Sequence, residues 1–165
     1  RQAAVMLMAG FDFGNRVDAL NAAQLAGIVQ IEALATANGQ MLLAQLRHYN
    51  YGFVGEYGQS QPVWVSARDA QGELVGGLRG FVFLEWLNVE LLFVDEAARH
   101  HGVGRNLLAT AEQKARNLGA HSVTLNTFEW QAREFYLKQG YEEFGHIDNY
   151  IQGFQLVYLK KVLMS

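Results

Sequence analysis

The segment "VELLFVDEAARHHGVGRNLLATAEQKARNLGA" (residues 89–120) gives the strongest indication of the fold, because it passes from an apolar strand through a glycine-containing loop into an amphipathic helix. After Gly102 the apolar residues recur at helical spacing, and Gly119 stands where a left-handed residue would end the helix. A loop that leads from a strand into a helix directs free backbone N–H groups, and the positive end of the helix, toward an anion. The segment therefore predicts a phosphate-binding loop. The alternative is that Gly102 and Gly104 only permit a tight turn and close packing of the helix.

Composition limits the classes of protein that this chain can belong to. Its 165 residues suit one domain with one core. The net charge of −3, with 18% charged residues, lacks the basic excess of phosphate-backbone binders, so we expect no nucleic-acid partner. The chain has no cysteine, which excludes disulfides, thiolate zinc sites and cysteine acyl-enzymes, and fits a reducing, cytoplasmic setting.

The stretch "RQAAVMLMAGF" (residues 1–11) is too short and too weakly charged to predict a signal peptide. It also falls below the roughly 18 apolar residues of a membrane span, so we expect no membrane association.

Periodicity and turn residues predict alternating elements along the rest of the chain. Residues 21–27 are alanine-rich and fit a short helix or an unstructured arm. The expected elements are a strand at 28–34, a helix at 39–50, strands at 62–69, 74–87 and 88–96, a helix from about 102 to 118, a strand at 121–126, a helix at 129–140, and strands at 141–147 and 153–163. A hairpin turn is expected at residues 69–72. This order predicts a mixed sheet with helices on its faces.

Three kinds of phosphate loop compete for the central segment. A Walker loop requires a lysine after the glycines, and none follows here. A dinucleotide fingerprint requires a third glycine where this chain has Leu107. The pattern [Q/R]-x-x-G-x-[G/A] after an apolar strand is matched by Arg99, Gly102 and Gly104.

With that pattern the chain resembles the GCN5-related N-acetyltransferase (GNAT) superfamily. Residues 89–120 resemble the family's central strand, pyrophosphate loop and helix, and "ARDAQGELVGGLRG" (67–80) resembles the hairpin before them. The stretch "LNTFEWQAREFYLKQGYEEFG" (125–145) resembles the second half of the family pattern. It keeps the motif A-x-x-F-Y-x-x-x-G-[YF] at Ala132, Phe135, Tyr136, Gly140 and Tyr141. The likeness divides the chain into an unassigned N-terminal extension, residues 1–27, and a single acetyltransferase domain, residues 28–165.

The resemblance implies an α/β (α+β) fold with a mixed, V-splayed sheet, helices on both faces, and central parallel strands that open to admit acetyl-coenzyme A. Backbone groups of Leu92, Phe93 and Val94 would pair with the pantetheine arm. The loop that begins at Arg99 would hold the pyrophosphate through the amides around His101, Gly102, Val103, Gly104 and Arg105. We expect no metal site, because the adjacent histidines at 100 and 101 point apart and no third ligand lies nearby in the sequence.

Acetyl transfer to an amine requires that the amine lose its proton before attack and that the departing thiolate gain one. Glu90 is the candidate base or substrate contact, and Glu85, expected on the preceding strand, is the reserve. Tyr136 occupies the family's general-acid position. The alternatives are a structural or solvent-facing Glu90 and a Tyr136 that is only packed against the sheet.

The acceptor site that the resemblance implies is built from the N-terminal helix, its following loop and the last hairpin. Its candidate residues are Tyr49, Tyr51, Trp86, Phe128 and Tyr150. Aromatic walls near acidic residues suit a small cationic or amphipathic amine, although each ring could equally belong to an ordinary core.

The function that we expect is N-acetylation of a primary amine of a small molecule by acetyl-coenzyme A, in a protein that could form a homodimer. Two alternatives stay open within the same fold: a non-catalytic acyl-CoA-binding sensor or interaction module, and an enzyme that acetylates a protein or peptide amine. A nucleotide-binding protein is a more distant alternative.

Overall fold

The computed structural model describes residues 37–163. The chain divides into two compact units, residues 1–56 and residues 57–165. In the first unit the described element is helix α1 (Ala37–Val54), which contains the expected helix at 39–50 and extends it at both ends. The expected strand at 28–34 and the extension at 1–27 lie outside the described residues.

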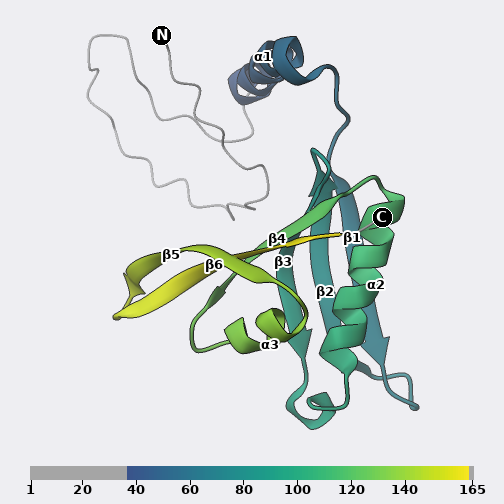
Figure 1. Ribbon diagram of the computed structural model, residues 1–165. Helices are drawn as coiled ribbons and strands as arrows, with labels where there is room; N and C mark the ends of the chain where they lie inside the picture. Colours follow the sequence, from purple (N-terminus) through teal and green to yellow (C-terminus); the bar gives the residue numbers. More distant parts are fainter. Residues whose placement is uncertain (1–36, 164–165) are drawn as a thin grey trace. The chain divides into compact units, whose positions relative to one another are not determined.

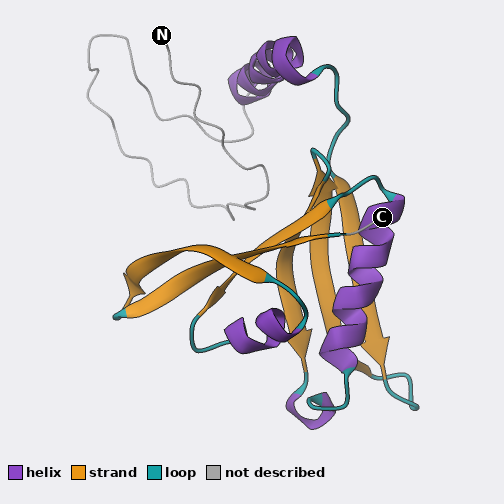
Figure 2. Ribbon diagram, viewed as in Figure 1, coloured by secondary structure: helices purple, strands orange, loops and turns teal. Residues whose placement is uncertain are grey.

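The second unit is a six-stranded mixed sheet in the order β1-β2-β3-β4-β6-β5, flanked by helices (Figures 1 and 2). Only β3 and β4 run parallel, and the other neighbouring pairs are antiparallel. The strands are β1 (Gln61–Arg68), β2 (Leu74–Phe83), β3 (Trp86–Val94), β4 (Ser122–Phe128), β5 (Glu142–Ile151) and β6 (Phe154–Val162), and the helices are α2 (Val103–Asn117) and α3 (Arg133–Lys138). The mixed sheet predicted from the sequence is therefore confirmed.

The first hairpin turns where the sequence predicted. The Asp69 carboxylate accepts hydrogen bonds from the backbone N–H groups of Gln71 and Glu73, both at 2.9 Å. An aspartate that bonds to nearby backbone amides in this way stabilises a turn without help from the rest of the fold.

The turn between β2 and β3 lies earlier than expected. Leu84 and Glu85 form it, with φ angles of 47° and 65°. Trp86 and Leu87 therefore begin β3, whereas the sequence placed them at the end of the preceding strand. No glycine or asparagine marks this left-handed pair, so the apolar run hid the turn. As a consequence Glu85 lies in the turn and not on a strand, which corrects its predicted place.

A β-bulge interrupts the pairing of β2 with β3. Gly80 pairs with Val89 and Arg79 with Leu91, which leaves Glu90 as the extra residue. A side chain at residue 80 would bring a Cβ atom to 2.4 Å from the carbonyl oxygen of Asn88, so only glycine fits at this close approach.

Helix α2 packs against β1, β2 and β3 and closes the core of this unit (Figure 1). Its buried stripe consists of Leu107, Leu108, Ala111, Glu112 and Ala115. The helix ends at the predicted Gly119, whose φ of 86° is left-handed.

Helix α3 is shorter than the expected range of 129–140. The residues before it form a turn, because the Gln131 side-chain oxygen accepts a hydrogen bond from the Phe128 N–H at 3.2 Å and the Gln131 N–H bonds to the Phe128 carbonyl at 2.9 Å. This local bonding takes residues 129–132 out of the helix.

One buried polar network joins α2 to the last strand. Glu112 is 4% exposed and accepts a hydrogen bond from the Tyr141 hydroxyl at 3.0 Å. Lys161 donates to both oxygens of Glu112, at 3.0 and 2.8 Å. Burial and the adjacent Glu112 carboxylate raise the pKa of Tyr141.

Candidate active site

The two parallel strands separate halfway along their length. Pairing between them covers Trp86–Val89 and Ser122–Leu125, after which β3 and β4 diverge (Figure 1). From Glu90 onward, β3 has no ladder with β4. The divergence begins at the bulged residue, since the bulge bends β3 at that point.

The loop after β3 leads into an α2 N-terminus that no side chain caps. Gly102 is the N-cap residue, with a left-handed φ of 79°. The N–H groups of the first helical turn, from Val103 to Arg105, consequently have no acceptor within the helix. The Arg105 guanidinium lies beside Gly102, with Nη2 3.4 Å from the position that a Cβ there would occupy. Free amides, the helix dipole and a guanidinium together suit a phosphate anion.

Two predicted loop residues also have structural contacts. Arg99 donates from Nε to the Val94 carbonyl oxygen at 3.0 Å, which ties the loop to the end of β3. A Cβ atom at Gly104 would lie 3.4 Å from the Phe135 ring and 3.6 Å from Val94, which are ordinary van der Waals distances. Helix packing at this position therefore does not by itself require glycine.

Tyr136 lies in α3 and is 6% exposed. Its ring contacts those of Phe135 and Tyr141, with centroids 5.1 and 5.5 Å away. Burial raises the pKa of the Tyr136 phenol to about 12. Within residues 37–163 its hydroxyl has no hydrogen-bond partner. The phenol therefore keeps its proton well above neutral pH, and its raised pKa makes it a weaker acid than an exposed tyrosine.

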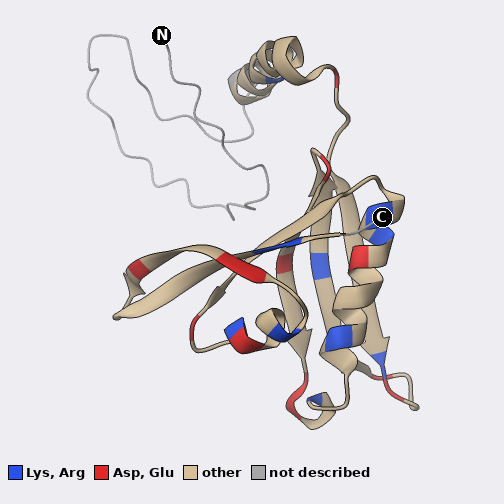
Figure 3. Ribbon diagram, in the orientation of Figure 1, with Lys and Arg blue, Asp and Glu red and all other residues tan. Residues whose placement is uncertain are grey.

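Glu90 is paired with a residue that the sequence analysis did not single out. Its Oε2 lies 3.0 Å from Nε of Arg79, and its side chain is 25% exposed. The Arg79 guanidinium in turn lies over the Trp64 ring, 5.8 Å from its centroid. The pair lies midway along β2 and β3, where basic and acidic positions adjoin (Figure 3). The Glu90 carboxylate is therefore fixed by its ion pair with Arg79 and does not simply point into solvent.

The structure brings together two of the five predicted acceptor residues. The rings of Phe128 and Tyr150 meet edge to face at 5.7 Å. Trp130 and Phe154, which the sequence analysis missed, join them. The only sequence signal for Trp130 was its place two residues after Phe128 in the motif region.

Of the other three predicted acceptor residues, one lies on β3 and two belong to the first unit. Trp86 contacts His121, with ring centroids 5.6 Å apart. Tyr49 and Tyr51 belong to α1 in the first unit, where the Tyr49 ring lies 5.2 Å from that of Phe53.

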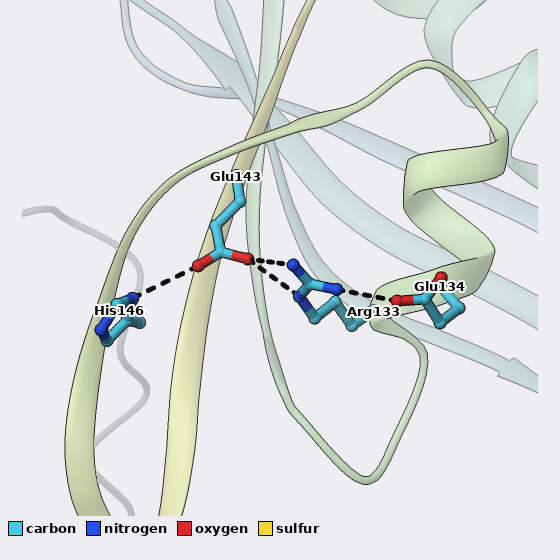
Figure 4. Close-up of polar contacts among 4 residues, drawn as sticks. All are labelled: Arg133, Glu134, Glu143 and His146. Carbon is cyan, nitrogen blue, oxygen red and sulfur yellow. Dashed lines mark hydrogen bonds and ion pairs between the residues drawn. The ribbon is translucent and has the colours of Figure 1, made fainter.

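A polar network connects the first turn of α3 to β5 (Figure 4). Arg133 donates from Nε and Nη2 to one oxygen of Glu143, each at 2.8 Å, and from Nη1 to Glu134 at 2.7 Å. His146 Nδ1 lies 3.3 Å from the other Glu143 oxygen. The hydrogen bond from Arg133 holds the pKa of Glu143 below its usual value, and the same bond raises the pKa of Arg133. These contacts fasten the short helix that carries Tyr136.

Among residues 37–163 no three histidine, aspartate or glutamate side chains come close enough together to hold a metal ion. No helix within the same range has the length and apolar character needed to cross a membrane.

Comparison with known proteins gives consistent results. The model of the acetyltransferase (GNAT) family matches residues 30–141. A blasticidin-S acetyltransferase of Streptomyces morookaense is 40% identical over 99 residues, which are 58% of this chain and 73% of the relative. An acetyltransferase of Agrobacterium fabrum is 32% identical over 113 residues, 68% of this chain and 82% of the relative. The crystal structure of an acetyltransferase from Bacillus cereus superposes with a TM-score of 0.69 at 28% identity, covering 82% of this chain and 98% of that one.

Proposed function

This chain belongs to the acetyltransferase (GNAT) family, and from that membership we propose that it transfers the acetyl group of acetyl-coenzyme A directly to a primary amine of a small molecule. Membership of this family makes the chain an acyltransferase. The proposal that acetyl-coenzyme A binds here rests mainly on one observation: β3 separates from β4 at Glu90, beside a helix whose N-terminus no side chain caps.

The proposed site for the cosubstrate follows from which backbone groups lack partners. The edge of β3 that β4 leaves unpaired, along the stretch Leu92, Phe93 and Val94, offers backbone groups to the amides of a pantetheine arm. The Val94 carbonyl oxygen is not one of the free groups, because it already accepts the hydrogen bond from Arg99. The pyrophosphate would then lie at the first turn of α2, against the amides of residues 103–105 and the Arg105 guanidinium. Arg99 would act indirectly, by holding the loop to Val94.

The chemistry assigned to the side chains is general acid–base catalysis. The amine nitrogen forms a bond to the thioester carbon, the carbon–sulfur bond breaks, and the thiolate takes its proton from the Tyr136 phenol. The proton of the attacking amine passes to Glu90, directly or through water. Positioned acids and bases of this kind accelerate a reaction by about 10²- to 10⁴-fold.

Small-molecule amines are the proposed acceptors because a relative that is 40% identical is named for an antibiotic. A non-catalytic acyl-CoA sensor would share the cosubstrate site without needing Tyr136 or Glu90. An enzyme for protein or peptide amines would share the chemistry and differ only in the acceptor.

The test is thermal unfolding with acetyl-coenzyme A, coenzyme A, ATP and NADH in parallel, followed by thiol release with a panel of amines. Saturation at about a hundred times the dissociation constant adds about 2.7 kcal/mol, which raises the midpoint by about 5–10 °C for a chain of this size. We expect this shift with both CoA ligands and not with NADH. The chain has no cysteine, so a thiol reagent reports only released coenzyme A. The absence of a shift with either CoA ligand would refute the proposal, and a shift without turnover of any amine would favour the sensor.

A further inference from the structure

Four aromatic rings gather at one end of the sheet. We call them the aromatic cluster: Phe128, Trp130, Tyr150 and Phe154. Phe128 and Trp130 stack with centroids 4.4 Å apart and planes at 10°. Phe154 meets Trp130 edge to face at 4.5 Å, and Tyr150 meets Phe128 in the same way at 5.7 Å. The cluster thus joins the segment after β4 to the β5–β6 hairpin.

The aromatic cluster is not part of the hydrophobic core. None of its rings belongs to the buried cluster between α2 and the sheet. Trp130, Tyr150 and Phe154 are 50%, 54% and 41% exposed. Exposed aromatic groups that already contact one another on the surface of a domain indicate a binding site, because the apolar area would otherwise be buried.

Hydrogen bonds hold the two segments of the cluster together. The Glu129 N–H donates to the Gln155 carbonyl at 3.2 Å, and the Gln155 N–H donates to the Glu129 carboxylate at 3.2 Å. The Gln155 side chain donates to Asp148 at 2.6 Å, and the Gly153 N–H donates to Asn149 at 2.9 Å. The rings are therefore presented on a fixed framework, which lowers the entropy cost of binding a ligand.

The charge around the cluster has one sign. Residues 128–132 and 147–157 contain Glu129 and Asp148 and no lysine or arginine. Figure 3 shows this end of the hairpin and the adjoining loop with acidic positions and no basic ones. Two basic side chains on the adjoining elements already have acidic partners, since His146 lies 3.7 Å from Asp148 and Arg133 is bound by Glu143 and Glu134. Aromatic faces with surrounding carboxylates complement a cation.

The cluster also lies near the opening between the parallel strands. Phe128 is three residues beyond Leu125, the last residue of β4 that pairs with β3. Three residues of extended strand span about 10 Å, so a small molecule can reach from one place to the other.

From these observations we infer that the aromatic cluster is a subsite for a cationic group of the acceptor, distinct from the amine that is acetylated. The inference names the acceptor class and so rests on the proposed function. The amine under attack must be neutral when it reacts, so the group that the rings and carboxylates bind is a second one that stays protonated at neutral pH. The acceptors are therefore molecules with at least two basic groups, and Trp130 and Phe154 become substrate-binding residues.

The test compares two probes with the same hydrocarbon chain and a planar end group that differs in charge. Hexylguanidine is cationic at neutral pH, and hexylurea is neutral. Their dissociation constants are measured on the full chain by ligand-observed NMR, without acetyl-coenzyme A. Trp130→Ala and Tyr150→Ala are the test variants. Phe144→Ala is the matched control, because Phe144 is an equally exposed ring, 54%, on β5 and outside the cluster.

We expect the guanidine to bind at least about ten-fold more tightly than the urea. Each test variant should weaken guanidine binding about three- to ten-fold and leave urea binding unchanged, while Phe144→Ala leaves both unchanged. Trp130→Phe, which keeps a ring, should restore most of the affinity and separates this effect from loss of the fold. Equal binding of the two probes, no binding of either, or equal loss of both in Trp130→Ala would overturn the inference.

A second copy of the chain is the alternative occupant. Sedimentation at rising protein concentration tests for this. The inference would also be overturned if the chain forms a dimer that excludes the probe and if Trp130→Ala dissociates that dimer. The acetyl-coenzyme A shift in thermal unfolding is measured separately. If the probes bind according to charge but acetyl-coenzyme A causes no thermal shift, the proposed function is refuted and the cation subsite is not. If acetyl-coenzyme A causes the shift but the probes bind equally, the cation subsite is refuted and the proposed function is not.

Discussion

The Nε atom of Arg79 lies 3.0 Å from Oε2 of Glu90, and this ion pair spans β2 and β3 at the residue where β3 bulges away from its neighbour. The candidate base is consequently held in a fixed position by its own sheet. A carboxylate fixed at the separation point of two strands can meet a substrate amine without first being ordered.

Glu90→Gln tests this role. If Glu90 takes the proton of the amine, kcat should fall about 10²- to 10⁴-fold while the acetyl-coenzyme A KM changes little. Steady-state thiol release measures both parameters. Glu73→Gln, an exposed glutamate in the first hairpin, is the matched control and should retain the wild-type rate. A Glu90→Gln enzyme within about two-fold of wild type would assign the base to another group.

Tyr136→Phe should lower kcat strongly and leave the thermal shift with acetyl-coenzyme A intact, because the hydroxyl supplies a proton and the ring supplies the packing. The raised pKa of about 12 keeps the phenol protonated, so Tyr136 should not impose an alkaline decline in rate at pH values up to about 10. A pH–rate profile checks this. An unchanged rate in Tyr136→Phe would remove the residue from the mechanism.

The same pKa predicts how stability depends on pH. The phenol of Tyr136 has a higher pKa in the folded protein, about 12, than its ordinary value of 10.0. Its contribution is fully present below pH 10 and is lost as the pH rises toward 12, when the unfolded chain releases the proton first. Urea denaturation across this range should show the free energy of unfolding falling by about 2 kcal/mol more in wild type than in Tyr136→Phe. Parallel curves for the two proteins would contradict the burial of the phenol.

The buried network around Glu112 predicts a large effect of one lysine and a small effect of its neighbour. Lys161→Met leaves the buried Glu112 carboxylate without its cation and should cost about 3–5 kcal/mol of unfolding free energy. Lys160→Met removes an exposed pair with Glu142, 3.2 Å long, and should cost less than about 1 kcal/mol. Urea denaturation of the two variants measures the contrast, and equal costs would show that burial does not strengthen the first pair.

Gly80→Ala tests the bulge. The added Cβ would lie 2.4 Å from the Asn88 carbonyl, so the bulge must shift or the strand must separate, at a cost of about 1–3 kcal/mol. We also expect a smaller thermal shift with acetyl-coenzyme A, because the bulge directs β3 away from β4. Gly145→Ala is the control, since nothing lies within 4 Å of a Cβ at that position. An unchanged midpoint and shift in Gly80→Ala would mean that the close approach is not required.

Much of the fold is determined by local sequence. The helical stripe after Gly102, the left-handed Gly119 and the turn around Asp69 each depend on residues within one or two turns of chain, so the sequence alone predicts them. The glycine loop before α2 and the motif around Tyr136 were predicted for the same reason. The turn at Leu84 and Glu85 was missed because its residues carry no local turn signal.

Contacts between segments that are distant in the sequence depend on the tertiary structure and could not be predicted from local patterns. The bulge at Glu90 arises from its register against β2, and Glu90 acquires Arg79 as a partner only once the two strands pair. The grouping of Phe128 and Trp130 with Tyr150 and Phe154 depends on β6 lying beside β4. Sequence periodicity identifies which residues share the face of one element, and it contains no information on which faces of different elements meet. That is set by packing, because the strands settle in the register that buries the most apolar surface and leaves the fewest polar groups unpaired.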